Sequence, residues 1–134
     1  MLRVTCAIII HNEKILLCQR GENMRLPLKW EFPGGKLEKD EAEEACIIRE
    51  IKEELHLHIH VGQQLTPVEY TYETFAICLI PFLATVTNPT LQLTEHKAYA
   101  WVSPQSLLQY DLAPADIPIV HEILQLWNLE YTKP

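Results

Sequence analysis

The stretch GGKLEKDEAEEACIIREIKEEL, residues 34–55, contains the features from which the fold and the chemistry of this chain are interpreted. Its two glycines, together with Pro33 before them, predict a loop that leads into an acidic run of helical character. Asp40 is expected to cap the helix, and Glu43 stands where a capping box requires an acidic residue. The helix is then predicted to run to about Leu55.

This helix is predicted to have one acidic side and one apolar side. At about 100° per residue, Glu50, Glu53 and Glu54 fall within roughly a third of the circumference, and Glu43 joins them. Like charges at this spacing repel one another, so the cluster needs a compensating cation. Arg49 is one candidate, and a hard divalent metal ion is another, because Mg²⁺ takes carboxylate oxygens as ligands. The side chains expected to project toward a core are Ile48, Ile51 and Leu55.

The glycines before the helix favour a metal site over a solvated surface helix, although solvated glutamate-rich helices are the more common of the two. Gly34 and Gly35 allow backbone conformations that other residues avoid, and they let the main chain approach a ligand closely. A glycine turn that leads into a helix N-terminus is also a place where a phosphate can bind. Such a turn beside a carboxylate cluster indicates metal-assisted phosphoryl chemistry.

The whole chain has 134 residues, the size of one domain, so residues 1–134 are expected to form a single unit. It has 11 Lys and Arg residues against 18 Asp and Glu residues, which argues against a basic surface for duplex nucleic acid. A small anionic ligand is still compatible with this charge, because a bound divalent cation inverts it locally. No stretch approaches the ~20 apolar residues of a membrane span.

The cysteines lie in apolar segments, and none forms a C-x-x-C pair. They are therefore expected to be buried free thiols in a reducing cytosol, rather than disulfides or zinc ligands. The apolar run CAIII, residues 6–10, is too short for the core of a signal peptide. A cytoplasmic protein fits these features. The cysteines are Cys6, Cys18, Cys46 and Cys78.

The remaining segments predict a mixed sheet with helices. Residues 3–10 and 14–20 are expected to form a hairpin around a polar turn. Pro81 marks an edge or a bulge within the long apolar segment 68–86, and apolar residues at helical spacing predict a helix over 117–129. This order indicates an α+β fold, an α/β/α sandwich with a mixed β-sheet between helices. Shorter elements are expected at 56–61 and 98–102, as strands, and at 103–110, as a helical turn.

The spacing of the acidic stretch resembles the Nudix box, G-x5-E-x7-R-E-U-x-E-E-x-G-U, where U is a bulky aliphatic residue. Only the last glycine is missing, and His56 stands in its place. The segments WEFPGGKLE, residues 30–38, and LAPADIPIV, residues 112–120, resemble the MutT-like branch of this family, especially its CTP pyrophosphohydrolases. The resemblance implies the Nudix fold. The matching positions are Gly35, Glu41, Arg49, Glu50, Ile51, Glu53, Glu54 and Leu57.

His56 stands where a helix of this family usually ends. Glycine there adopts a left-handed conformation cheaply, whereas histidine does so at a cost of roughly 1 kcal/mol. The departure concerns the shape of the helix end and not the chemistry, because no carboxylate is lost. His58 and His60 are expected to be exposed strand positions, and not members of a metal trio with His56.

The resemblance implies hydrolysis of a nucleoside triphosphate to the monophosphate and pyrophosphate, with Mg²⁺, or Mn²⁺, as cofactor. Cytidine nucleotides (CTP, dCTP, 5-methyl-dCTP) or oxidised guanine nucleotides (8-oxo-dGTP) are the expected substrates. Two alternatives stay open: hydrolysis of another nucleoside diphosphate derivative, and a non-catalytic nucleotide-binding module. The expected partner is this small molecule, with neither duplex nucleic acid nor a membrane, and the chain is expected to be a monomer or a homodimer.

By the same resemblance, the acidic helix supplies the catalytic residues Glu50, Glu53 and Glu54. Arg49 is expected to orient these carboxylates through charge-assisted hydrogen bonds, and Glu50 to act as the general base or an additional ligand. A solvated loop position is the alternative for the downstream acid Glu95. The expected metal ligands are the Gly34 carbonyl, Glu50, Glu54 and Glu95.

The resemblance also places the nucleotide. Arg20 matches a nucleotide-contacting position, Arg25 is a weaker candidate, and Glu41 is expected to brace the loop or the helix start. Asp116 matches the position that reads the base, with capping of the last helix as its alternative role. An ionised aspartate only accepts hydrogen bonds, which favours the amino group of cytosine and leaves guanine open. The expected substrate-binding residues are Arg20, Arg25, Glu31, Phe32, Pro33, Gly34 and Asp116.

Overall fold

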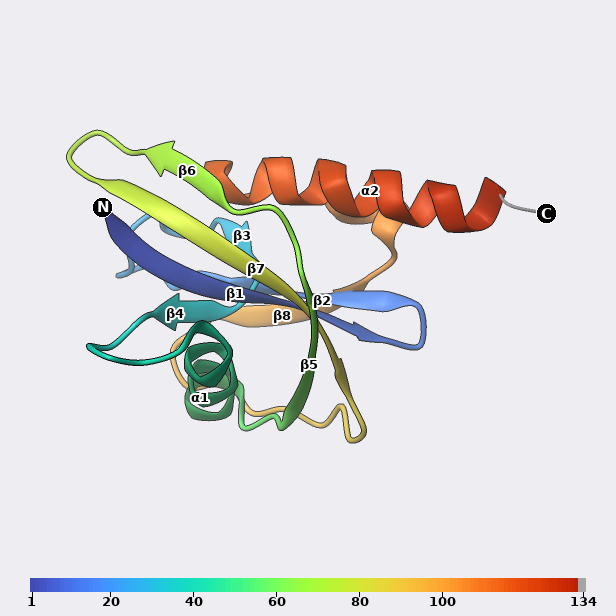
Figure 1. Cartoon of the computed structure of the whole chain (residues 1–134), viewed down its shortest axis with the longest axis horizontal. Coiled ribbons are helices and arrows are strands. Elements are labelled where there is room, and N and C mark those ends of the chain that lie inside the picture. Colours follow the sequence, from blue (N-terminus) through green and yellow to red (C-terminus); the bar gives the residue numbers. More distant parts are fainter. Residues whose placement is uncertain (133–134) are drawn as a thin grey trace.

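The computed structural model describes the backbone of residues 1–132 and the side chains of residues 1–128. Strands occupy both halves of the chain, one α-helix lies between them, and a second closes the described part (Figure 1). The elements are β1 (Leu2–His11), β2 (Lys14–Gln19), β3 (Trp30–Glu31), β4 (Gly34–Lys36), α1 (Glu43–Leu55), β5 (Ile59–Gln64), β6 (Val68–Thr71), β7 (Ala76–Val86), β8 (Ala98–Val102), the 3₁₀ helices η1 (Pro104–Gln109) and η2 (Pro114–Asp116), and α2 (Ile117–Thr132).

The strands form one mixed sheet in the order β3-β2-β1-β7-β5. The central strand β1 runs parallel to β7, from the pair Leu2 and Ile77 to the pair Ile10 and Thr85. On its other edge, β1 pairs with β4 in its first half and with β2 in its second half. The helices α1 and α2 lie on opposite sides of the sheet (Figure 1). The predicted sandwich, with a mixed sheet between helices, is confirmed.

Pro81 lies where β7 changes its antiparallel partner. Strand β6 pairs with β7 up to Leu79, and β5 pairs with it from Phe82 onward. Because proline has no N–H group, it is best placed where the ladder is already interrupted. The carbonyl of Pro81 accepts a hydrogen bond from the Leu65 amide at 2.9 Å. The predicted irregularity is therefore confirmed, but the prediction of an edge strand is wrong, since β7 is paired on both sides.

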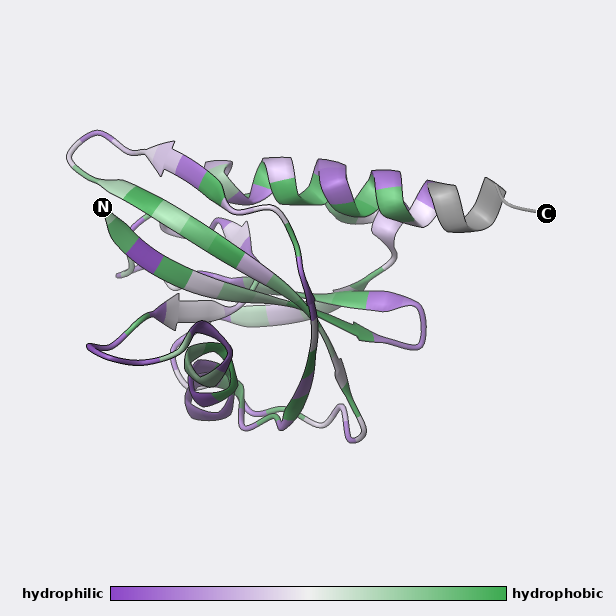
Figure 2. Cartoon of the chain, in the orientation of Figure 1, coloured by the Kyte–Doolittle hydropathy of each residue, from purple (hydrophilic) through white to green (hydrophobic). Residues whose placement is uncertain are grey.

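Two hydrophobic cores fill the two faces of the sheet, because side chains alternate along each strand. On β1, Ile8 belongs to the core beneath α2, whereas Ile9 belongs to the core beneath α1. Figure 2 shows the resulting apolar strands between the two helices. Each fully buried aliphatic side chain contributes about 1.5–3 kcal/mol. Both cores are therefore needed for the fold, and α1 is held from its apolar side.

The start of α1 differs from the prediction. Its N-cap is Ala42, which makes no side-chain cap, and the helix begins at Glu43. Asp40 has a φ of 62° and lies in an exposed turn before the cap, so the predicted capping box is wrong. Glu43 is also separated from the acidic cluster, because it forms an ion pair with Arg3.

The apolar side of α1 is also displaced from the prediction. Ile48 is 43% exposed, so its expected place in the core is wrong, whereas Ile51 and Leu55 are buried as predicted. Ile47 takes the place of Ile48, since residues 47, 51 and 55 follow one another at four-residue spacing along the face against the sheet. The turn of roughly 100° between neighbouring residues is enough to bring Ile48 to the solvent.

The cysteines are all free thiols, as predicted. Cys6, Cys18 and Cys46 are buried, and Cys78 is half-buried. Burial raises the pKa of the Cys6 thiol, so it is protonated and unreactive in the folded protein. Within the part of the chain that the structure describes, no helix is both long and apolar enough to cross a membrane.

Candidate active site

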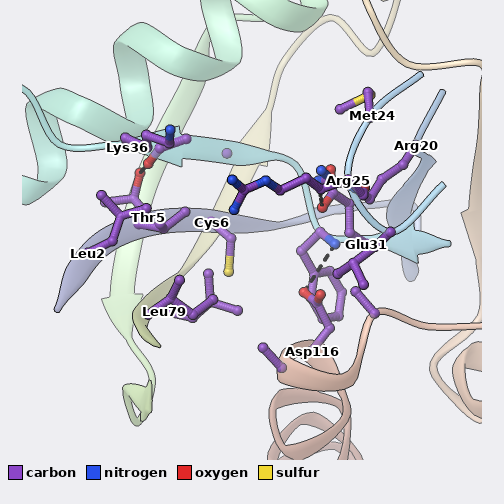
Figure 3. A pocket seen from close by; sticks show the side chains of 18 of the residues that line it. Leu2, Thr5, Cys6, Arg20, Met24, Arg25, Glu31, Lys36, Leu79 and Asp116 are labelled. Carbon is purple, nitrogen blue, oxygen red and sulfur yellow. Dashed lines mark hydrogen bonds and ion pairs between the residues drawn. The ribbon is translucent and has the colours of Figure 1, made fainter. Parts of the chain in front are cut away.

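Most residues predicted to bind the nucleotide meet in one pocket of about 380 Å³. In Figure 3, Glu31 and Asp116 lie toward one end of this pocket and Lys36 toward the other. Pro33, which was also predicted to bind the nucleotide, does not line the pocket. Its carbonyl accepts a hydrogen bond from the Ala7 amide at 2.8 Å. The predicted site residues that do line the pocket are Arg20, Arg25, Glu31, Phe32, Gly34, Glu54 and Asp116.

Arg49 lies at the centre of the acidic cluster, behind the pocket. Its Nε and Nη2 atoms donate to the two oxygens of Glu41, at 2.7 and 2.9 Å. Its Nη1 atom donates to Glu50 at 2.9 Å and to Glu53 at 3.2 Å. One guanidinium therefore offsets the repulsion between several carboxylates and holds them in fixed directions.

Glu41 fastens the loop before α1 to the helix, as predicted. In addition to its two bonds from Arg49, it accepts the backbone amide of Glu38 at 3.0 Å. The hydrogen bonds from Arg49, followed by the Glu38 amide, lower the pKa of Glu41 to about 2. Its carboxylate is therefore ionised at neutral pH and is fully engaged in structure rather than in the pocket.

Glu54 is the carboxylate of the acidic helix that lines the pocket. Burial, followed by the charge of Glu50, raises its pKa to about 9. Its Oε2 atom is buried and has no hydrogen-bond partner among the described residues. Without a cation, the Glu54 side chain therefore keeps a proton that an exposed glutamate would lose.

The glycines do not form the predicted turn. Gly34 and Gly35 belong to strand β4 and have ordinary backbone conformations, so the expected role of positive φ angles is wrong. Glycine is needed at these two positions because a larger residue would not fit. A Cβ atom on Gly34 would collide with the Thr5 carbonyl, and one on Gly35 would collide with the Glu50 carboxylate. Glycine is thus required because β4 lies so close to β1 on one side and to α1 on the other.

The chemistry of this cluster fits a hard divalent cation. Among the described residues, no three His, Cys, Asp or Glu side chains already converge in a metal-binding arrangement. However, Glu54 has an unpartnered buried oxygen, and Glu50 and Glu95 lie close enough to raise its pKa through their charges. Oxygen donors with excess negative charge are the ligands that Mg²⁺ prefers. The predicted ligand set, with the Gly34 carbonyl, stays a prediction that this environment supports.

The other end of the pocket contains a second ion pair. Arg20 donates through Nη1 to Glu31 Oε1 at 2.8 Å, and its Nε donates to the Arg25 carbonyl. The Arg25 guanidinium lies over the Phe75 ring, 4.5 Å from its centroid. These contacts hold both arginines in the lining of the pocket. Their positive charges make this end of the pocket suitable for the anionic groups of a ligand.

Asp116 reaches the pocket from η2, far along the chain from the acidic helix. It is only 4% exposed, and its Oδ1 atom accepts the Phe32 amide at 3.3 Å. Burial, followed by the charge of Glu31, raises the pKa of Asp116 well above its ordinary value. The carboxyl group is therefore neutral over a wider pH range than that of a surface aspartate, and its predicted role in reading the base stays a prediction.

Sequence reasoning missed several residues that line the pocket, among them Tyr72, Phe75 and His96. Tyr72 and Phe75 stack at 5.3 Å and stand in the turn between β6 and β7. Aromatic residues in a hairpin turn give a signal, because turns favour polar residues. His96 gives none, since it follows Glu95 in a loop of no regular pattern.

Comparison with known proteins agrees with this arrangement. The NUDIX domain profile matches residues 1–123, so the chain belongs to the NUDIX family and is a Nudix hydrolase. It is 39% identical over 126 residues to the CTP pyrophosphohydrolase of Escherichia coli, covering 94% of this chain and 93% of that protein. It is also 30% identical to the nucleoside triphosphatase NudI of Escherichia fergusonii, covering 81% of this chain and 86% of that one.

Solved structures show the same likeness. The solution structure of the E. coli ORF135 protein superposes with a TM-score of 0.84 at 37% identity, covering 99% of this chain and 95% of that one. The MutT protein of a methicillin-resistant Staphylococcus aureus strain is 43% identical, with a TM-score of 0.76 and coverage of 92% and 95%. The predicted Nudix fold and family are thereby confirmed.

Proposed function

We propose that this chain is a Mg²⁺-dependent nucleoside triphosphate pyrophosphohydrolase that converts cytidine triphosphates to the monophosphate and pyrophosphate. The observation that carries the proposal is that two carboxyl groups line one pocket. They are Glu54, from the acidic helix, and the buried Asp116. A polar group for the base and one carboxylate of the acidic helix for the cation thus line the same cavity. The likeness to the E. coli CTP pyrophosphohydrolase supports the choice of base.

The cation would be held by the Gly34 carbonyl, Glu50, Glu54 and Glu95. When bound, Mg²⁺, or Mn²⁺ in its place, neutralises charge on the phosphates and lowers the pKa of a water molecule. Arg49 donates to Glu50 Oε1 at 2.9 Å and so orients the carboxylate that is proposed as the general base or as an additional ligand. Glu53, on the same guanidinium, is restrained beside it.

Asp116 is proposed to recognise the base as a neutral acid. Its Oδ1 atom accepts the Phe32 amide, so the proton resides on Oδ2 and the group offers one donor and one acceptor. Cytosine presents the complementary pair, an acceptor at N3 and a donor at its amino group. One such contact discriminates by about 1–3 kcal/mol.

Turnover of a nucleotide panel with Mg²⁺ tests the proposal. The panel is CTP, dCTP, 5-methyl-dCTP, 8-oxo-dGTP, dGTP, dTTP and dATP, with the monophosphate and pyrophosphate identified as products. We expect the cytosine compounds to give the highest kcat/KM. If the folded protein with Mg²⁺ hydrolyses none of them, the triphosphate proposal is wrong, and another nucleoside diphosphate derivative or a non-catalytic role must be considered.

The variant Asp116→Asn tests how the base is recognised. Asparagine keeps one donor and one acceptor on a neutral group, so the preference for cytosine should survive within about tenfold, whereas Asp116→Ala should lose it. If Asp116→Asn loses the preference as fully as Asp116→Ala, the carboxylate is read in its ionised form.

Oxidised guanine nucleotides are the second candidate substrates. The specific observation in their favour is the 43% identity to the S. aureus MutT structure, which exceeds the identity to the E. coli enzyme. A higher kcat/KM for 8-oxo-dGTP than for CTP in the same panel would assign the chain to nucleotide-pool sanitation and would leave the proposed chemistry unchanged.

A further inference from the structure

His96 lies between the two ends of the pocket. It stands in the loop between β7 and β8, and its side chain is only 2% exposed. Its Nε2 atom is 2.9 Å from Glu31 Oε2, and its Nδ1 atom is 3.9 Å from Glu54 Oε2. Both the Nδ1 atom and Glu54 Oε2 are buried without a hydrogen-bond partner among the described residues.

The hydrogen bonds of Glu31 determine the direction of this contact. Glu31 Oε1 accepts from Arg20 at 2.8 Å, so Oε2 is the oxygen left to accept from His96. The Nε2 atom therefore donates, and Nδ1 faces the unpartnered oxygen of Glu54. A continuous series of side chains, from Arg20 through Glu31 and His96 to Glu54, thus crosses the pocket wall.

The loop that carries His96 is fastened on both sides. Thr94 donates from its amide and its hydroxyl to the Glu54 carbonyl, at 3.2 and 2.9 Å. The Lys97 amide donates to the Gln19 carbonyl at 2.9 Å. The imidazole ring is therefore held in place relative to both α1 and β2, as a positioning residue must be.

We propose that His96 is a positioning residue that couples nucleotide binding at Arg20 and Glu31 to the orientation of Glu54. This inference rests on the proposed function, and neither the family signature nor the sequence analysis assigns His96 a role. At 3.9 Å the Nδ1 atom is too far from Glu54 Oε2 for a hydrogen bond, so the ring acts on Glu54 as a packed neighbour that limits where its carboxylate can lie. A nucleotide that fixes Arg20 and Glu31 holds the ring against Glu54.

Two substitutions separate the two contacts of the ring. In His96→Gln the amide reaches the position of Nε2, so Glu31 keeps its donor but nothing faces Glu54. In His96→Asn the amide lies near the position of Nδ1, and the bond to Glu31 is lost. For the best substrate of the panel, we expect His96→Gln to lower kcat by about tenfold or more with KM nearly unchanged, and His96→Asn to raise KM by about tenfold.

The control is His60→Gln, because His60 is exposed on β5 and bonds only to Thr87 among the described residues. It should leave kcat and KM unchanged. Equal falls of kcat in all three variants, or an unchanged kcat in His96→Gln, would overturn the proposal.

A second measurement does not need turnover. In EDTA, the shifts in Tm caused by His96→Gln and Glu54→Gln should not add in the double variant, because the two side chains are in contact. Additive shifts would overturn the proposal for His96. If the wild type hydrolyses no nucleotide but the shifts are non-additive, the proposed function fails and the contact stands.

Discussion

At the scale of single residues, Glu54 has the most costly environment in the acidic helix. Below about pH 4.5 its carboxyl group is protonated in both the folded and the unfolded chain, and its burial as an acid costs little. Between pH 4.5 and about 9 the unfolded chain releases a proton that the folded chain keeps. Stability of the metal-free protein therefore falls as the pH rises through this window.

The variant Glu54→Gln should relieve this cost, because glutamine is neutral and of similar shape. In EDTA at pH 8, we expect its Tm to exceed that of the wild type by roughly 3–8 °C, and the difference to vanish below pH 4.5. Mg²⁺ should raise the Tm of the wild type more than that of the variant, and turnover should be lost. A variant less stable than the wild type at pH 8 would contradict the buried, protonated state of Glu54.

Arg49 acts through its shape as well as its charge. In Arg49→Lys the positive charge remains, but one ammonium group cannot contact Glu41, Glu50 and Glu53 together. We expect kcat to fall by about 10²-fold because the carboxylates lose their orientation. The matched control is Arg3→Lys, since Arg3 also pairs with a glutamate of α1 but lies outside the pocket. It should keep wild-type kcat, and equal losses in both variants would indicate general destabilisation.

At the scale of elements, α1 ends on a strained residue. His56 has a φ of 56° and a ψ of 33°, in the left-handed region, and its amide donates to the Lys52 carbonyl. The backbone thus adopts the helix end for which the family uses glycine, although the side chain departs from the box. The interpretation that the departure concerns only the helix end is consistent with this geometry, because every carboxylate of α1 keeps its place.

The variant His56→Gly should therefore stabilise the protein. Removal of the side chain relieves the left-handed strain, and we expect the free energy of unfolding to rise by about 1 kcal/mol in urea denaturation, with kcat unchanged. The control is His58→Gly, at an exposed position without a positive φ, which should lower stability because glycine only adds freedom to the unfolded chain. Destabilisation by both substitutions would show that the His56 side chain makes a contact of its own.

At the scale of the whole molecule, the pocket exists only because distant segments meet. Arg20 directly follows β2, Glu54 comes from α1, His96 from the loop after β7, and Asp116 from η2. The central pair of β1 and β7 brings these segments together, since every other strand except β3 and β8 pairs with one of the two. Stability of the two cores and integrity of the site are therefore linked.

Thiol reactivity measures the integrity of both cores at once. Cys6 belongs to the core beneath α2, and Cys18 to the core beneath α1. In the native protein we expect a thiol reagent to modify only the half-buried Cys78 quickly, and to modify all four cysteines once urea unfolds the chain. Fast modification of Cys6 or Cys18 under native conditions would show that one core is open.

Local patterns in the sequence were sufficient for the longer elements and for the carboxylates of α1, but not for β3 and β4, which were expected to form a loop. The hairpin, the acidic helix and the C-terminal helix depend on contacts between near neighbours, which residue spacing describes directly. Errors arose where spacing is not decisive. Two features do not depend on the helix alone. One is the choice between Ile47 and Ile48 as the core residue, and the other is the N-cap at Ala42 instead of Asp40. Both depend on how the helix lies against the sheet.

The sequence by itself therefore determined the family signature, the mixed sheet between helices and the carboxylates that define the chemistry. Only the tertiary structure decided why Gly34 and Gly35 must be small, that burial raises the pKa of Asp116, and that His96 lies between Glu31 and Glu54. The physical reason is that packing distance, burial and charge proximity join residues far apart in the chain. No local pattern of residues encodes them, and they exist only once the chain has folded.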